Sequence, residues 1–167
     1  MRRFSLVVIM LSLILSGCAK KQEEKKMVFA FVPKLLDNPV FQVAWQGAQA
    51  GAADLGKGKI EVQRFAPVKS DAVEQAQIIE SLIEKKVDGI AISVNDADAL
   101  TESINRAVDA GIPVVCFDSD APKSKRFAYY GTANLPSGKQ MAEHLVKRMG
   151  TRGSIAMLMG TPGAPNL

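Results

Sequence analysis

The chain has 167 residues, room for one ordinary domain, and 47% are hydrophobic against 23% charged, as expected for a packed globular core. The formal net charge of +4 arises before Met27, where six of the 21 basic and two of the 17 acidic residues lie, so the remaining chain is neutral. A neutral domain gives no reason to expect a nucleic-acid partner.

The N-terminus is predicted to be an export signal with a lipid attachment site. Arg2 and Arg3 precede an apolar run, 4–15, that is too short to span a bilayer comfortably. The tetrapeptide Leu-Ser-Gly-Cys, which ends at Cys18, resembles the lipobox of bacterial lipoproteins. This implies cleavage before Cys18 and lipidation of its thiol; the alternatives are an uncleaved anchor or an ordinary signal peptide with a chance cysteine.

These features divide the N-terminus into a signal peptide, 1–17, and a lipidated cysteine with a solvated, lysine-rich tether, 18–26. The protein is then expected to be exported and lipid-anchored to the cell envelope, facing the periplasm or the cell exterior. Cys116 is the other cysteine, so no disulfide framework is expected. It lies in an apolar run, which favours a small core residue over a catalytic thiol.

Strand and helix patterns alternate from Met27 onward, at about every 25 to 30 residues. In the first unit, an apolar run predicts a buried strand, and the following helix has Asn38 as its N-cap and Pro39 in its first turn. This alternation predicts a doubly wound parallel α/β sheet whose first, third and fourth strands are central and buried. The predicted strands are 27–32, 60–65, 90–94, 113–117, 127–131 and 154–159, and the predicted helices are 39–55, 71–86, 99–110 and 134–149.

Polar side chains follow the carboxyl ends of these strands, where the loops of a doubly wound sheet face one crevice. Carboxylate and amide groups there suit sugar hydroxyls. Phe41, just inside the first helix, could stack on the apolar face of a pyranose, whereas Trp45, one turn deeper, is expected in the core. The polar candidates are Asp37, Asn38, Ser93, Asn95, Asp96, Asp118, Ser119, Asp120, Thr161 and Asn166.

A series of short motifs accompanies these loops. The motifs are Asp37-Asn38-Pro39-Val40-Phe41 with Gly47-Ala48, Val87-Asp88-Gly89-Ile90, Asp96-Ala97-Asp98-Ala99, Ala110-Gly111-Ile112-Pro113-Val114, Phe117-Asp118, and 134–138 at the start of a helix. In this order and spacing they resemble the ribose-type periplasmic sugar-binding proteins, which have the type I periplasmic-binding-protein fold. The resemblance covers Met27 to Asn166.

The resemblance implies that Asn38 and Phe41 contact the ligand and that Asp118 accepts hydrogen bonds from sugar hydroxyls. Where the family often has Asn, this sequence has Ser93, and Asn95 could substitute for it. Where ribose binders have Arg, this sequence has Ser119. A bidentate donor is therefore missing, which weakens the case for a ribose-like ligand.

Members of this family have two similar lobes that close over the ligand. The resemblance implies that 27–159 form the N-terminal lobe and that 160–167 begin the crossover to a second lobe that this sequence lacks. It further implies a solute-binding lipoprotein of an ABC-type importer, which delivers a sugar or similar small polar solute to a membrane permease. Such a protein performs no catalysis, and neither a cofactor nor a metal is expected.

Three other functions compete with this one. A nucleotide-cofactor enzyme on a Rossmann-like sheet should carry G-x-G-x-x-G after its first strand, but 33–37 read Pro-Lys-Leu-Leu-Asp. A transcription regulator of related fold needs an N-terminal helix-turn-helix, whose place the leader occupies. A ligand-sensing protein that reports to a chemoreceptor or sensor kinase would use the same lobe, and the sequence leaves this alternative open.

Overall fold

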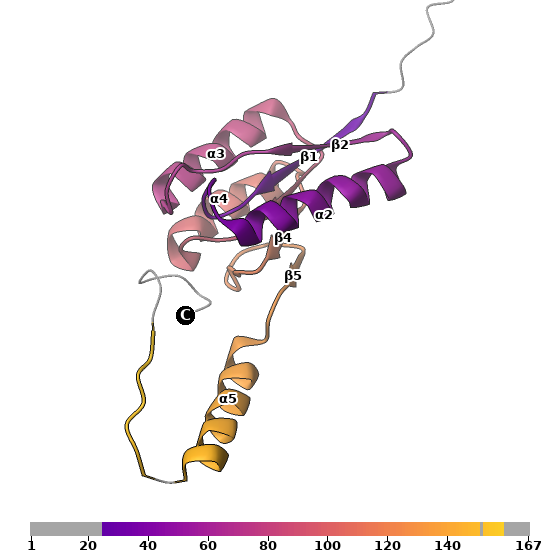
Figure 1. Ribbon diagram of the computed structural model, residues 1–167. Coiled ribbons are helices and arrows are strands. Elements are labelled where there is room, and N and C mark those ends of the chain that lie inside the picture. The colour runs from indigo at the N-terminus through magenta and orange to yellow at the C-terminus, as the bar shows by residue number, and fades with distance from the viewer. Residues whose placement is uncertain (1–24, 151, 159–167) are drawn as a thin grey trace, which may run out of the picture.

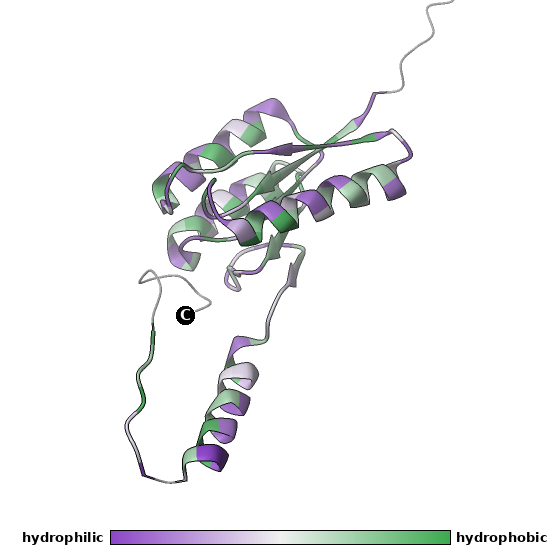
Figure 2. Cartoon of the chain, in the orientation of Figure 1, coloured by the Kyte–Doolittle hydropathy of each residue, from purple (hydrophilic) through white to green (hydrophobic). Residues whose placement is uncertain are grey.

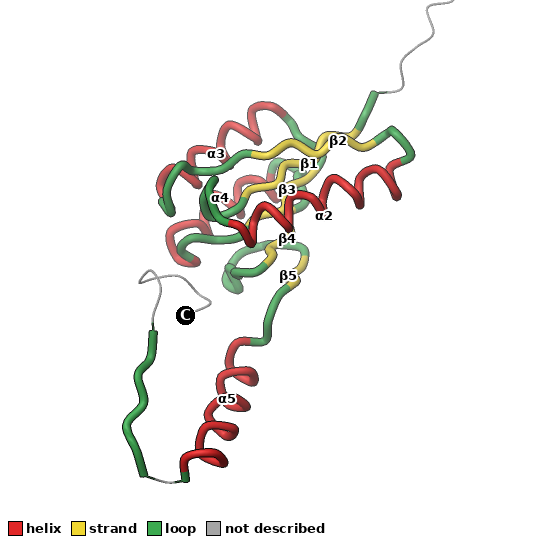
Figure 3. The backbone as a smooth tube through the Cα atoms, in the orientation of Figure 1, coloured by secondary structure: helices red, strands yellow, loops and turns green. Residues whose placement is uncertain are grey.

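Five parallel strands form one sheet in the order β2-β1-β3-β4-β5 (Figures 1 and 3). This computed structural model describes residues 25–150 and 152–158. The doubly wound α/β prediction is confirmed, with the first, third and fourth strands central. The elements are β1 (Met27–Val32), α2 (Pro39–Gly56), β2 (Ile60–Arg64), α3 (Ala72–Lys85), β3 (Gly89–Ile92), α4 (Ala97–Asp109), β4 (Val114–Phe117), β5 (Ala128–Tyr130) and α5 (Asn134–Met149).

Side-chain caps set the starts of the first three of these helices. Asn38 Oδ1 accepts a hydrogen bond from the Val40 N–H of α2 at 2.9 Å, as predicted. Asp71 caps α3 and Asp96 caps α4 in the same way, each from an extended backbone conformation. Because Asp96 supplies this cap, α4 begins two residues before the predicted start at 99.

The main core lies between the sheet and the helices α3 and α4, which cover the face opposite α2 (Figure 1). Ile79 and Leu82 of α3, together with Leu100 and Ile104 of α4, are fully buried. Cys116 of β4 is also fully buried in this core, so its prediction as a core residue is confirmed. Over the described residues, none of the helices combines the length and the apolar character needed to cross a membrane.

The α2 face of the sheet is covered less completely. Trp45 was expected in the core but is only half-buried, with its ring 5.7 Å from that of Phe31. Phe31 in turn stacks on Phe117 at 4.9 Å, and Phe41 meets Phe117 edge-on at 6.3 Å. These four rings form an aromatic cluster contributed by α2, β1 and β4.

The chain beyond β5 does not pack on the sheet. Helix α5 has the predicted bounds, yet none of its residues is buried, and Figure 1 shows it pointing away from the other helices. Figure 2 shows apolar residues, in green, along α5 and the segment after it. The packed body therefore ends at β5, earlier than the lobe boundary expected at 159.

The predicted sixth strand is wrong in the described residues: 154–158 have no strand structure and are exposed. A strand needs a neighbour for its backbone hydrogen bonds, and this segment does not join the sheet edge at β5. The expectations for 1–17, Cys18, most of the tether, the crossover at 160–167, Thr161 and Asn166 fall outside the described residues.

Candidate functional site

Asp118 is held in an unusual backbone conformation where β4 ends. Its φ of 59° is left-handed, which non-glycine residues adopt rarely and aspartate tolerates better than most. Its backbone is fixed by β5, because its N–H donates to the Tyr130 carbonyl at 3.0 Å and its own carbonyl accepts from the Tyr129 hydroxyl at 2.9 Å. A residue held in this way at the carboxyl edge of a sheet is a candidate ligand contact.

The carboxylate of Asp118 lies toward the ends of β3 and β1. Ser93 Oγ donates to Asp118 Oδ2 at 2.7 Å. The Lys34 ammonium lies 3.9 Å from the same oxygen. Ser93 and Asp118, both predicted site residues, thus lie together in space, and Lys34 joins them from the loop after β1. The side chain of Asp118 is 36% exposed, so its carboxylate remains accessible from solvent.

Lys34 is a residue that the sequence analysis missed. Its side chain is only 12% exposed, which is rare for lysine. Burial lowers the pKa of its ammonium, and the nearby Asp118 carboxylate opposes that shift only in part. The signal available in the sequence was its place, two residues beyond a buried strand, at the edge where ligands bind.

Hydrogen bonds from buried side-chain amides connect the loops that follow β1, β2 and β3. Gln75 of α3 is fully buried; its Nε2 donates to the Ser93 carbonyl at 2.8 Å and to the Pro33 carbonyl at 3.3 Å, and its Oε1 accepts from the Asn95 N–H at 2.9 Å. Asn95 Nδ2 donates to the Lys34 carbonyl at 2.9 Å, and Asn95 Oδ1 accepts from the Ser70 hydroxyl. This Gln75–Asn95 network fixes the backbone that carries Lys34 and Ser93.

Four of the predicted ligand residues are buried in the protein or engaged by its own groups. Asn95 bonds within the network at both ends of its amide, so it positions the neighbouring loops. Ser119 is 1% exposed. Phe41 is 4% exposed and belongs to the aromatic cluster, while Asn38 is half-buried and caps α2. Gln75 escaped prediction, although a glutamine aligned with Ile79 and Leu82 on the buried face of a helix is itself a signal.

Ion pairs brace the loop that begins at Asp118. Arg126 binds Asp120 through two guanidinium nitrogens, one of them 2.8 Å from Oδ2. Lys123 contacts Asp98 and Lys125 contacts Asp109, at 2.9 and 2.6 Å. The basic residues of this loop are thus matched by acids of the same body, and exposed pairs of this kind contribute little stability each. Together they fix the loop's path.

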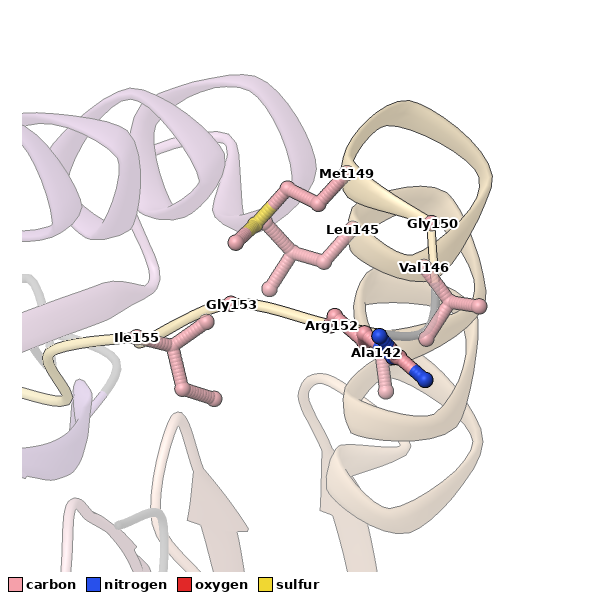
Figure 4. A pocket seen from close by; sticks show the side chains of 8 residues that line it. All are labelled: Ala142, Leu145, Val146, Met149, Gly150, Arg152, Gly153 and Ile155. Carbon is pink, nitrogen blue, oxygen red and sulfur yellow. The ribbon is translucent and has the colours of Figure 1, made fainter.

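A separate cavity lies between α5 and the segment after it. Its volume is about 240 Å³, and Figure 4 shows Leu145 and Met149 of α5 and Ile155 around it. Its lining is mostly apolar and therefore offers few partners to a sugar hydroxyl. None of its lining residues is a predicted site residue. Among residues 25–150 and 152–158, no cluster of His, Cys, Asp and Glu could hold a metal ion.

Comparisons with known proteins identify the family of this chain. A family model, the periplasmic binding protein domain, matches residues 29–167. The chain belongs to this family. The resemblance to its ribose-type sugar-binding branch, which the motifs indicated, is thereby confirmed.

Individual proteins similar to this chain support the same family assignment. The ribose import binding protein RbsB of Bacillus subtilis is 26% identical over 98% of this chain and 56% of its own length. The structure of an ABC transporter solute binding protein from Burkholderia graminis, in complex with D-arabinose, has a TM-score of 0.80 at 38% identity, over 87% of this chain and 49% of that one. A structure of the XylFII–LytSN complex has a TM-score of 0.78 at 30% identity, over 84% and 50%. The chain therefore spans about half the length of such relatives.

Proposed function

We propose that this chain supplies the first lobe of a solute-binding protein that captures a sugar or similar small polar solute for an ABC-type importer. The observation that carries the proposal is the Asp118 carboxylate, held by β5 at the carboxyl edge of the sheet beside Ser93 and Lys34. A carboxylate in this position accepts hydrogen bonds from ligand hydroxyls. The relatives named for ribose and for a D-arabinose complex support a sugar as the ligand.

The lobe boundary in this proposal lies at 131–133, not at 160–167. Support comes from α5, which has apolar side chains but no buried residue. Its Leu135 and Val146, for example, are exposed to solvent. In this view α5 and the segment at 152–158 open the second lobe, whose remainder would cover them. The ligand cleft would then lie between the Asp118 edge and that lobe, and closure of the two lobes over the sugar would be the signal that a permease reads.

Loss of the Asp118 charge tests the cleft directly. Asp118→Asn keeps a side chain that tolerates the left-handed backbone, so the fold should persist. In the full-length gene product we expect the affinity for the best of D-ribose, D-arabinose and D-allose, measured by calorimetric titration, to fall by about 2 kcal/mol or more. The control is Asp109→Asn, which neutralises an exposed, paired carboxylate. Equal binding by the parent and Asp118→Asn would refute the cleft.

The proposal includes a lipid anchor at Cys18 and export to the cell envelope, supported by the Leu-Ser-Gly-Cys tetrapeptide behind an apolar run. Cys18→Ala should release the protein from membranes or block its processing, because the acylated thiol is lost. The measurement is incorporation of radiolabelled palmitate together with membrane fractionation. Equal palmitate incorporation into the variant and the parent would contradict the anchor.

A sensing role is the second candidate. It is favoured by the XylFII–LytSN complex, in which a structurally similar chain is bound to a second protein. The same cleft would bind the ligand, and the closed form would be read by a partner other than a permease. Sugar uptake by cells that lack the gene separates the two roles, because only the importer component is needed for uptake itself.

A further inference from the structure

We infer that the amino edge of the sheet, at the opposite end of the strands from Asp118, is a docking surface for an anionic lipid bilayer. The inference goes beyond the proposed function, which concerns the carboxyl edge. Figure 1 shows β1 beginning beside the turn between α2 and β2, at the end of the body where α3 also finishes. Three segments form this amino edge: 25–28 at the start of β1, 54–60 between α2 and β2, and 84–88 between α3 and β3.

Hydrogen bonds hold the three segments of the amino edge together. The Met27 N–H donates to the Lys59 carbonyl at 2.8 Å. Val28 makes two bonds with Asp88: its N–H donates to Asp88 Oδ2 at 2.7 Å, and its carbonyl accepts from the Asp88 N–H at 2.8 Å. The side chains of these segments therefore stand on one fixed surface.

The amino edge carries an excess of positive charge. Its three segments contain six lysines against three acids, Asp54, Glu84 and Asp88. Lys85 places its ammonium over the ring of Phe65, 4.8 Å from the centroid. The other five lysines are exposed: Lys25, Lys26, Lys57, Lys59 and Lys86. Because the chain after the tether is neutral as a whole, this local excess gives the body a positive end, which an anionic surface would attract and orient.

The charges of the amino edge differ from those of the loop after β4, where acids of the same body match the basic residues. Lys57 and Lys86 make no ion pair with any residue among 25–150 and 152–158. The turn between α4 and β4 adds one acid to this end of the sheet, Asp109, and Lys125 pairs with it at 2.6 Å. The positive excess is therefore not cancelled by neighbouring acids.

Two of the exposed lysines occupy positions that glycine usually takes. Lys57 caps α2 with a φ of 45°, and Lys86 caps α3 with a φ of 54°, both in the left-handed region. A lysine at a helix C-terminus also complements the helix dipole. That explanation does not extend to Lys25 and Lys26, which precede a strand. What the four lysines share is their place on one edge, as a docking surface requires.

Exposed apolar side chains lie among these lysines. Leu55, two residues before Lys57, is 83% exposed, and Met27 is 45% exposed. Side chains of this kind enter the boundary between headgroups and acyl chains while neighbouring lysines bind the headgroups. In the proposed anchored protein, residues 18–26 join the acylated Cys18 to this edge and span at most about 30 Å. The anchor would thus keep the amino edge at a high effective concentration near the bilayer.

Docking at the amino edge would set the orientation of the lobe. The strands are parallel, so their amino and carboxyl ends lie at opposite sides of the sheet. The carboxyl edge with Asp118 would then face away from the bilayer and stay open to solutes. Each lysine near an anionic surface strengthens binding only by about fivefold, so the docked lobe could still be released to meet a membrane protein.

Co-sedimentation with vesicles tests the docking surface. The chain from residue 18 onward is used with Cys18→Ser, so that no acyl group contributes to binding. Phosphatidylcholine vesicles with about one third phosphatidylglycerol should bind it at about 0.05 M NaCl and release it at about 0.5 M, because salt screens exposed charges. Vesicles of phosphatidylcholine alone should not bind it, since they offer no net negative charge.

Charge variants locate the binding to the amino edge. Lys57→Asn combined with Lys86→Asn should weaken binding to the anionic vesicles by about tenfold or more, and asparagine tolerates the left-handed backbone at both positions. The matched control, Lys69→Asn combined with Lys123→Asn, removes the same charge from exposed lysines of the carboxyl-edge loops. It should change binding by less than about twofold. Both double variants should melt at the temperature of the parent.

A fluorophore reports which edge meets the lipid. Cys116 is buried, so a polarity-sensitive maleimide dye labels an introduced cysteine selectively. Attached at Leu55→Cys, the dye should shift its emission to the blue when anionic vesicles are added. Attached at Val68→Cys, an exposed position on the loop that follows β2 at the carboxyl edge, it should not shift.

Four results would overturn the inference. They are no binding to the anionic vesicles, equal binding to neutral ones, equal losses in the two double variants, and a blue shift at Val68→Cys instead of Leu55→Cys. Binding of soluble polyglutamate as tight as that of the vesicles would also overturn it, because the partner would then be an acidic polymer. Sugar affinity of the Lys57 and Lys86 double variant should equal that of the parent, so these results leave the proposed function intact.

Discussion

Residues 27–130 and 134–158 carry equally clear strand and helix patterns, yet only the first part is packed. Helix α3 buries Gln75, Ile79 and Leu82, whereas α5 buries nothing. Leu135 of α5 is 87% exposed, and Leu158 is almost wholly so. The contrast shows that the apolar pattern of a segment identifies the side chains that it can bury. Whether those side chains are buried depends on the neighbouring elements that pack against them.

The same contrast separates helices from strands. A helix satisfies its backbone hydrogen bonds within itself, so 134–149 is helical without tertiary packing. A strand finds its partners on a neighbour, so 154–158 remains without strand structure despite its apolar sequence. A lobe boundary at 131–133 would produce this difference, because α5 and 152–158 would then not belong to the packed body.

The largest expected difference between the two parts comes from truncating one leucine in each. In purified residues 27–158, Leu82→Ala should lower the free energy of unfolding by about 2–5 kcal/mol, because it opens a cavity in the core. Leu145→Ala should change it by less than about 0.5 kcal/mol, since α5 is not packed on the body. Urea unfolding followed by circular dichroism and by Trp45 fluorescence measures both.

A protein that also carries the proposed second lobe sharpens this test. If α5 belongs to the second lobe, Leu145→Ala should become costly there, while the effect of Leu82→Ala should stay the same. Equal costs for the two substitutions in 27–158 would mean that α5 packs on the body, against the boundary proposed at 131–133.

The packed body was predictable because its signals are local and agree with one another. Asn38, followed by Pro39, marked the start of α2 correctly, and alternation of strands with helices gave the parallel sheet. The site was harder to predict from the sequence. Lys34, Ser93 and Asp118 converge only through the strand order, and the Gln75–Asn95 network joins positions 20 residues apart. Sequence patterns do not reveal such long-range pairing of polar groups.

The next largest expected difference between the packed body and residues 134–158 is the reactivity of their sulfur-containing side chains. Burial raises the pKa of the Cys116 thiol from 9.0 to about 11, so at pH 8 its thiolate population falls by roughly 100-fold. Alkylation of native Cys116 by iodoacetamide, followed by mass spectrometry, should be slower by at least that factor than after unfolding in guanidinium chloride. Met141 and Met157, 64% and 79% exposed, should in contrast be oxidised readily by peroxide. Rapid labelling of native Cys116 would contradict its burial.

The smallest expected effect concerns the start of α5. Helices α2, α3 and α4 each begin with a side-chain cap, but Ala133 precedes α5 and makes no such bond. Ala133→Asp should stabilise this helix by about 1 kcal/mol, through a cap to the N–H of Leu135 and a favourable charge at the helix N-terminus. In 27–158 this predicts roughly fivefold slower hydrogen exchange at the amides of Leu135, Ser137 and Gly138, with an unchanged global unfolding midpoint.

The matched change in the body is Asp71→Ala, which removes two cap hydrogen bonds, to the N–H groups of Val73 and Glu74. Because α3 is packed on the sheet, this loss of about 1 kcal/mol should appear in the global unfolding free energy and not only in local exchange. Ala133→Leu, which offers no acceptor, should leave exchange at Leu135, Ser137 and Gly138 unchanged. If Ala133→Asp shifted the global midpoint as far as Asp71→Ala does in the opposite direction, α5 would be folding as one unit with the body, and the division at 131–133 would be wrong.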